Sequence, residues 1–94
     1  MDTPLPVLVL YTRDGCHLCE EARAIVQGLL EDRAARSQRI AALHERDIAA
    51  DAALERRFFA TIPVLELGGE RLELATSPAR IRRFLDDALD RSLV

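Results

Sequence analysis

The sequence has no tryptophan and no lysine, and it contains only two cysteines. Two cysteines are too few for a small secreted domain that is held together by many disulfides, so that class is excluded. No apolar run approaches the roughly 18 residues of a membrane-spanning helix. Residues 1–6 lack a basic stretch followed by an apolar stretch, so we expect no secretory signal and a cytoplasmic location.

The sequence also lacks an excess of basic charge. Thirteen basic residues, all of them arginine, are outweighed by 16 acidic residues, which leaves a net charge of −3. This balance provides no electrostatic surface for nucleic acid or for an anionic membrane. Hydrophobic residues make up 49% of the 94 residues, which is too many for a disordered chain. We therefore expect one globular domain over residues 1–94, most simply a monomer.

The hydrophobic pattern predicts an α/β fold with the order β-α-β-α-β-β-α. Residues 7–11 are a continuous apolar run, which is typical of a strand covered on both faces. A parallel pair from the first β-α-β unit and an antiparallel hairpin give a mixed four-stranded sheet with helices on its faces. The expected strands are residues 7–11, 40–48, 62–67 and 70–74, and the expected helices begin near residues 16, 51 and 77.

Local sequence signals predict the faces, ends and register of several of these elements. Leu18, Ala22 and Val26 recur at helical spacing and predict an apolar stripe on the first helix. Residues 32–39 are polar and predict the turn that follows this helix. The polar second strand belongs at a sheet edge. Gly68-Gly69 fits a two-residue hairpin loop, in which Leu65 opposes Leu72 and Glu66 opposes Arg71. Asp51 and Ser77 are expected helix caps.

The two cysteines carry the chemistry. Cys16 follows a buried strand and stands at the first turn of a helix, where the peptide N–H groups and the helix dipole stabilise an anion such as a thiolate. Cys19 lies one turn further on, beside the expected buried stripe. Cys16 is then the exposed attacking thiolate and Cys19 the resolving thiol of a redox dithiol. His17 adjoins the nucleophile, and its imidazolium form would favour the thiolate.

Other functions fit the same two cysteines. A Cys-x-x-Cys pair is also half of a metal site, although zinc prefers four ligands and only His17 and His44 are available as additions. For this reason we expect no metal ligands. A carrier of metal or of an iron–sulfur cluster, and a binding module without catalysis, remain alternatives.

The segment Val9-Leu10-Tyr11-Thr12-Arg13-Asp14-Gly15-Cys16-His17-Leu18-Cys19, with Thr61-Ile62-Pro63-Val64-Leu65 downstream, resembles a glutaredoxin-like protein of the thioredoxin fold. The resemblance implies a thiol–disulfide oxidoreductase that reduces protein or small-molecule disulfides. It implies that Pro63 is cis and faces the dithiol, and that the main chain of Ile62 pairs with the bound thiol peptide.

The resemblance also assigns Arg13 to the family's glutathione-binding basic position, with glutathione as a co-substrate and no tightly bound cofactor. Two positions depart from the family pattern. His17-Leu18 stands where glutaredoxins usually carry Pro-Tyr, and Ala75-Thr76-Ser77-Pro78 stands where they carry Gly-Gly-x-x-Asp.

Overall fold

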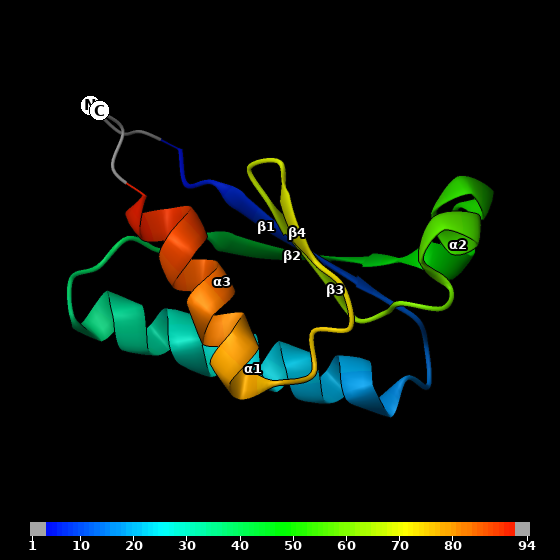
Figure 1. The fold of residues 1–94 in the computed structure, drawn as a ribbon, viewed down its shortest axis with the longest axis horizontal. Helices are drawn as coiled ribbons and strands as arrows, with labels where there is room; N and C mark the ends of the chain where they lie inside the picture. Colours follow the sequence, from blue (N-terminus) through cyan, green and yellow to red (C-terminus); the bar gives the residue numbers. More distant parts are fainter. Residues whose placement is uncertain (1–3, 92–94) are drawn as a thin grey trace.

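The computed structural model describes residues 4–91 (Figure 1). Its order of strands and α-helices is the predicted one, with a short 3-10 helix added before the second α-helix. The elements are β1 (Val7–Thr12), α1 (His17–Ala35), β2 (Ala42–Asp47), η1 (Ile48–Ala50), α2 (Ala52–Phe58), β3 (Val64–Leu67), β4 (Glu70–Leu72) and α3 (Pro78–Asp90).

The four strands form one mixed sheet in the order β2-β1-β3-β4. β1 runs parallel to β2 and antiparallel to β3, and β2 is an edge strand as its polarity predicts. The hairpin has the predicted register, with Leu65 opposite Leu72 and Glu66 opposite Arg71. Gly68 and Gly69 both have positive φ angles, which a two-residue loop of this kind requires.

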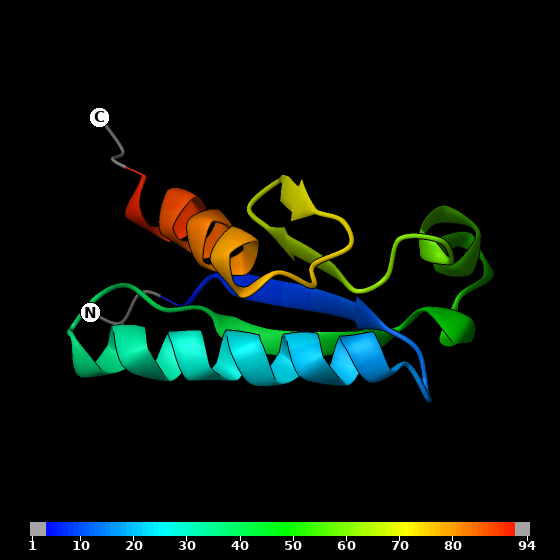
Figure 2. The same cartoon turned by 60° about the horizontal axis from the view of Figure 1, so that its bottom comes forward.

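Side chains that alternate along β1 point into two separate clusters, one on each face of the sheet. Leu8 and Leu10 pack with residues of α1 and α3, whereas Tyr11 packs with Phe58 of α2. In Figures 1 and 2, α2 lies apart from α1 and α3, near the end of the sheet where β1 leads toward α1. Helices therefore cover both faces, and the thioredoxin-like α/β fold is confirmed.

Several local expectations are wrong. The strands expected at residues 40–48 and 62–67 begin two residues later, at Ala42 and Val64. α1 continues to Ala35 through part of the segment predicted as a turn, because the polar Arg33 is buried and finds partners on α3. β4 ends at Leu72, so Leu74 lies beyond the hairpin. Leu18 is 49% exposed, because the buried stripe of α1 starts from Cys19 and continues through Ala22 and Val26.

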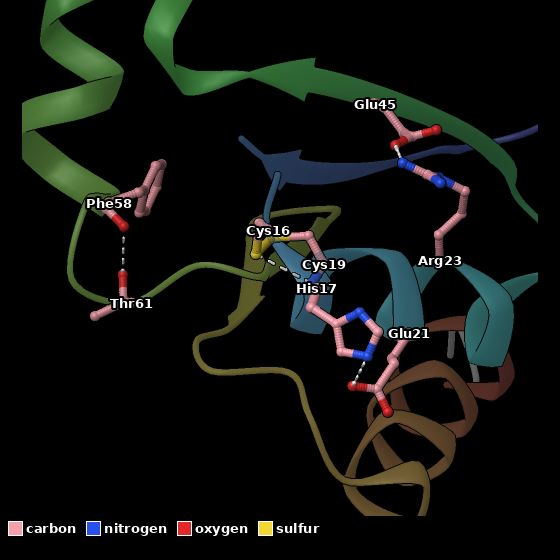
Figure 3. Close-up of a disulfide and its surroundings, with 8 residues drawn as sticks. All are labelled: Cys16, His17, Cys19, Glu21, Arg23, Glu45, Phe58 and Thr61. Atoms are coloured by element: carbon pink, nitrogen blue, oxygen red, sulfur yellow. Dashed lines mark hydrogen bonds and ion pairs between the residues drawn. A yellow bond between two sulfur atoms is a disulfide. The ribbon is translucent and has the colours of Figure 1, made fainter. Parts of the chain in front are cut away.

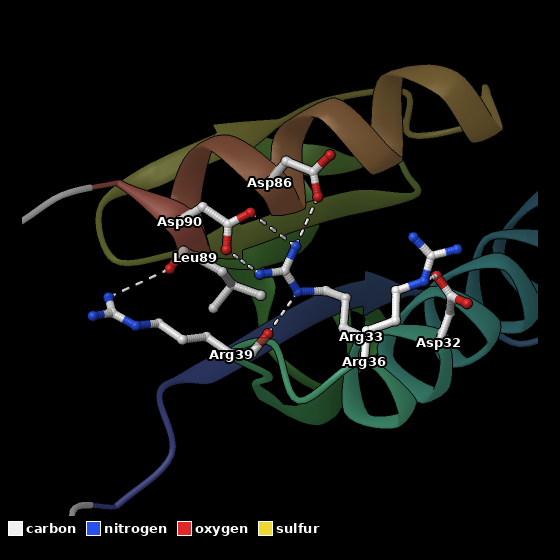
Figure 4. A network of polar contacts seen from close by, with 7 residues as sticks. All are labelled: Asp32, Arg33, Arg36, Arg39, Asp86, Leu89 and Asp90. Atoms are coloured by element: carbon white, nitrogen blue, oxygen red, sulfur yellow. Dashed lines mark hydrogen bonds and ion pairs between the residues drawn. The ribbon is translucent and has the colours of Figure 1, made fainter.

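A buried arginine joins the C-terminal parts of α1 and α3 (Figure 4). The Arg33 side chain is 5% exposed. Its Nε donates to the carbonyl oxygen of Arg39 at 2.6 Å, and its Nη1 donates to Oδ1 of Asp86 at 2.7 Å. The guanidinium also bonds Asp90, and this bond lowers the pKa of the Asp90 carboxyl. The network fixes the end of the molecule that lies away from the two cysteines.

Candidate functional site

Cys16 occupies the N-cap of α1 and forms a disulfide with Cys19 (Figure 3). A tight turn positions Cys16 at this helix end. Gly15 has φ 76°, and the N–H of Cys16 donates to the carbonyl of Arg13 at 3.2 Å. The Sγ atom of Cys16 accepts the backbone N–H of Cys19 at 3.1 Å. Sulfur therefore takes the place of the side-chain oxygen that usually caps a helix, at the positive end of the helix dipole.

The two sulfurs differ in their access to solvent. Cys19 is 1% exposed and lies among the buried side chains of α1, whereas Cys16 is half-buried. An incoming disulfide can reach Cys16 but not Cys19. This asymmetry agrees with the spacing argument, which makes Cys16 the attacking sulfur and Cys19 the resolving one.

The two basic residues predicted beside the dithiol are both paired with carboxylates. The side chain of His17 is 84% exposed, and its Nε2 lies 3.8 Å from Oε2 of Glu21. Figure 3 shows the imidazole turned toward Glu21 and away from the sulfurs. Arg13 forms an ion pair with Glu55 of α2. Glu55 could not be recognised as a partner from the sequence, because the pair joins two elements that are distant along the chain.

The loop before β3 lies at the same end of the sheet as the disulfide. Tyr11 is opposite Val64, so continuing the antiparallel register brings Thr12 beside Pro63. The Ile62–Pro63 peptide bond is cis, and Pro63 is fully buried. Figure 3 shows the chain from Thr61 toward β3 running past the disulfide.

Backbone hydrogen bonds hold this loop on both sides. The N–H of Ile62 donates to the carbonyl of Phe58 at 3.1 Å. The carbonyls of Thr61 and Pro63 each accept a hydrogen bond at 2.8 Å, from the N–H groups of Leu74 and Ala75. Within residues 4–91 the carbonyl of Ile62 accepts no hydrogen bond. A peptide that pairs with Ile62 would therefore find the carbonyl open and the N–H already engaged.

Tyr11 is a packing residue on the α2 side of the sheet. Its ring centroid lies 4.6 Å from that of Phe58, and its hydroxyl donates to Oε1 of Glu66 at 2.8 Å. Burial, followed by the hydrogen bond and charge of Glu66, raises the pKa of the phenol. The phenol is therefore neutral at physiological pH and is not a base for the cysteines.

Across the described part of the chain, residues 4–91, no three His, Cys, Asp or Glu side chains are grouped so that they could hold a metal ion. Among the helices in the same residues, none is both long enough and apolar enough to cross a membrane.

The chain is similar to a known protein family and to solved structures. The profile of the Glutaredoxin-like domain (DUF836) family matches residues 7–91. A crystal structure of XcR50 from X. campestris is 35% identical and covers 86% of this chain and 97% of its own, with a TM-score of 0.69. A solution structure of XcR50 gives a TM-score of 0.66 at the same identity, covering 86% of this chain and 94% of its own.

A solution structure of Ne2328 from Nitrosomonas europaea is 30% identical. It covers 78% of this chain and 79% of its own, with a TM-score of 0.58. No curated protein matches the chain significantly.

Proposed function

Because the chain belongs to the glutaredoxin-like domain family, we propose that it is a thiol–disulfide oxidoreductase that works through Cys16 and Cys19. One observation carries the proposal: a half-buried sulfur caps a helix N-terminus, and a buried partner sulfur lies within disulfide reach. A structural role for this disulfide is a poor alternative, because a loop closed by residues three apart stabilises little.

The reaction runs by thiol–disulfide exchange in two steps. In the reduced protein the Cys16 thiolate attacks one sulfur of the substrate disulfide, which forms a mixed disulfide and releases the other sulfur as a thiolate. The Cys19 thiolate then attacks Sγ of Cys16 and releases the second substrate thiol. Two electrons pass to the substrate, one proton from Cys19 and one from the solution complete its two thiols, and the protein is left as the Cys16–Cys19 disulfide.

The helix terminus supplies the reactivity of Cys16. The N–H of Cys19 points at its sulfur, and the α1 dipole has its positive end there. Settings of this kind lower a thiol pKa from about 8.5 into the range of about 3.5–7.5. This setting favours the thiolate form of Cys16 over the thiol.

The proposal extends to the setting of the reaction. The protein acts as a monomer in the reducing cytoplasm, without a tightly bound cofactor. A low-molecular-weight thiol such as glutathione restores the dithiol, and Arg13, His17, Ile62 and Pro63 bind the substrate. Arg13 and His17 exchange their ion pairs with Glu55 and Glu21 for the substrate when it binds.

Cysteine variants test the proposal directly. Pre-reduced protein is mixed with a glutathione mixed disulfide of a small thiol, and the released thiol is measured over time. Cys16→Ser is expected to abolish the reaction, because serine is a far weaker nucleophile. Cys19→Ser is expected to react once and accumulate a mixed disulfide on Cys16, which mass spectrometry detects. Equal rates for the wild type and Cys16→Ser would refute the proposal and favour a binding module.

A further inference from the structure

Large apolar side chains are exposed on the segments that surround the disulfide. Leu18 lies within the Cys16–Cys19 loop and is 49% exposed, and Phe59, just after α2, is 64% exposed. Leu74 is 48% exposed, and its N–H bonds the loop that leads to Pro63. These side chains lie on segments that lead to or from the disulfide and the loop before Pro63, where a bound protein substrate would contact them.

The backbone of Leu74 adds a second observation. Its φ is 51°, a left-handed conformation that is disfavoured for a residue with a branched side chain. Core packing does not explain this conformation, because the side chain is about half exposed. The conformation keeps a leucine on the surface beside the candidate site, where a solvated loop would favour glycine or asparagine.

An unpaired arginine lies next to Leu74. Arg80 and Leu74 line an open groove of about 680 Å³ along the hairpin, together with Arg71 and Glu73. Arg80 stands in the first turn of α3, where positive charge opposes the helix dipole. Within residues 4–91 no carboxylate forms an ion pair with it. The side chain is thus free to bind an anion from a partner.

Features that would favour glutathione are absent or engaged. Arg13, at the family's glutathione-binding position, is paired with Glu55. The segment before α3 has Ala75-Thr76-Ser77-Pro78, and its Ser77 side chain caps the helix by accepting the N–H of Arg80 at 3.3 Å. The surface beside the dithiol is therefore better suited to an apolar peptide with a negative charge than to a small charged tripeptide.

We propose, resting on the oxidoreductase function above, that the substrate disulfide belongs to a protein whose cysteine is flanked by a large apolar and an acidic residue. The apolar side chain packs between Leu18 and Leu74, and the carboxylate pairs with Arg80 in the groove. Cys16 and Cys19 supply both electrons for the reduction, as in the two steps above.

The experiment compares two 12-residue disulfide peptides with a glutathione mixed disulfide of a small thiol. The peptides are identical except beside one cysteine, where one carries Leu and Asp and the other Ser and Lys. Pre-reduced protein reacts in a single turnover, and thiol release gives the rate. The test variants are Leu74→Asn, which tolerates the left-handed backbone, and Arg80→Gln. The matched controls are Leu5→Asn, an equally exposed leucine distant from the site, and Arg83→Gln, an arginine on α3 that forms no ion pair with the residues the structure describes.

The wild type is expected to reduce the Leu–Asp peptide about tenfold faster than the Ser–Lys peptide, since an apolar contact and an ion pair are both lost in the second. Each test variant is expected to lower the ratio of the Leu–Asp rate to the Ser–Lys rate about threefold. The rate with the small mixed disulfide is expected to stay unchanged. Equal rates for the two peptides, or variants that slow all three substrates alike, would overturn the proposal. Failure of all three substrates with the wild type would instead refute the oxidoreductase function.

Discussion

Replacing Arg33 by alanine tests how the two helices that flank the site are held together. The guanidinium donates four hydrogen bonds, one to the Arg39 carbonyl, one to Asp86 and two to Asp90. A hydrogen bond to a charged group is worth about 1.5–3 kcal/mol, and breaking a buried pair costs about 3–5 kcal/mol. The Asp86 and Asp90 side chains are 51% and 47% exposed, so water replaces part of what they lose.

We therefore expect Arg33→Ala to lower the free energy of unfolding by about 2–3 kcal/mol. Urea denaturation followed by circular dichroism measures this loss, with an unchanged m-value as the sign that the transition stays two-state. Arg36→Ala is the matched control, because Arg36 is 67% exposed and bonds only Asp32 on its own helix. We expect that control to cost less than about 0.5 kcal/mol. A loss below about 1 kcal/mol for Arg33→Ala would show that the network contributes little and that the reasoning from burial is wrong.

Two further predictions concern pH. Arg33 lowers the pKa of Asp90 in the folded protein, so this carboxylate stabilises the fold above its ordinary pKa near 3.8 and loses that contribution as acid protonates it. Asp90→Asn is therefore expected to flatten the acid side of the stability–pH curve, and an unaltered curve would contradict the assignment. Burial raises the pKa of Tyr11, so its contribution is complete below pH 10 and falls as the phenol ionises at higher pH. Tyr11→Phe is expected to cost about 1 kcal/mol at neutral pH through the lost bond to Glu66, and to reduce the decline in stability above pH 10 that urea unfolding measures.

The sequence predicts best those features that short-range patterns determine. Gly68-Gly69 and the facing leucines set the hairpin register, and Ser77 before Pro78 marks the start of α3. The Cys-x-x-Cys pair directly follows a buried strand and a short loop, so the first cysteine falls at the start of the next helix and the second one turn later.

Features that depend on contacts between distant segments were not predictable. Arg33 looks like a turn residue by polarity, and only the carboxylates of α3 explain why it is buried and helical. Arg13 looks free in the sequence, and only the position of α2 brings Glu55 to it. The side of α1 that the sheet covers depends on the angle at which the helix crosses the sheet, so residue spacing alone places Leu18 on the wrong face.

The order of charges along α3 has a consequence for the electric field at the groove lined by Leu74 and Arg80. Arg80, Arg82 and Arg83 lie in its first half, and Asp86 and Asp90 lie in its second half. These side-chain charges run in the same direction as the peptide dipoles of the helix, positive toward its start. That start is joined to the cysteine end of the sheet, since Ala75 bonds the carbonyl of Pro63. The positive charge thus concentrates at the start of α3, on the side of the groove that Arg80 lines, and dissolved salt is expected to weaken its attraction for an acidic partner.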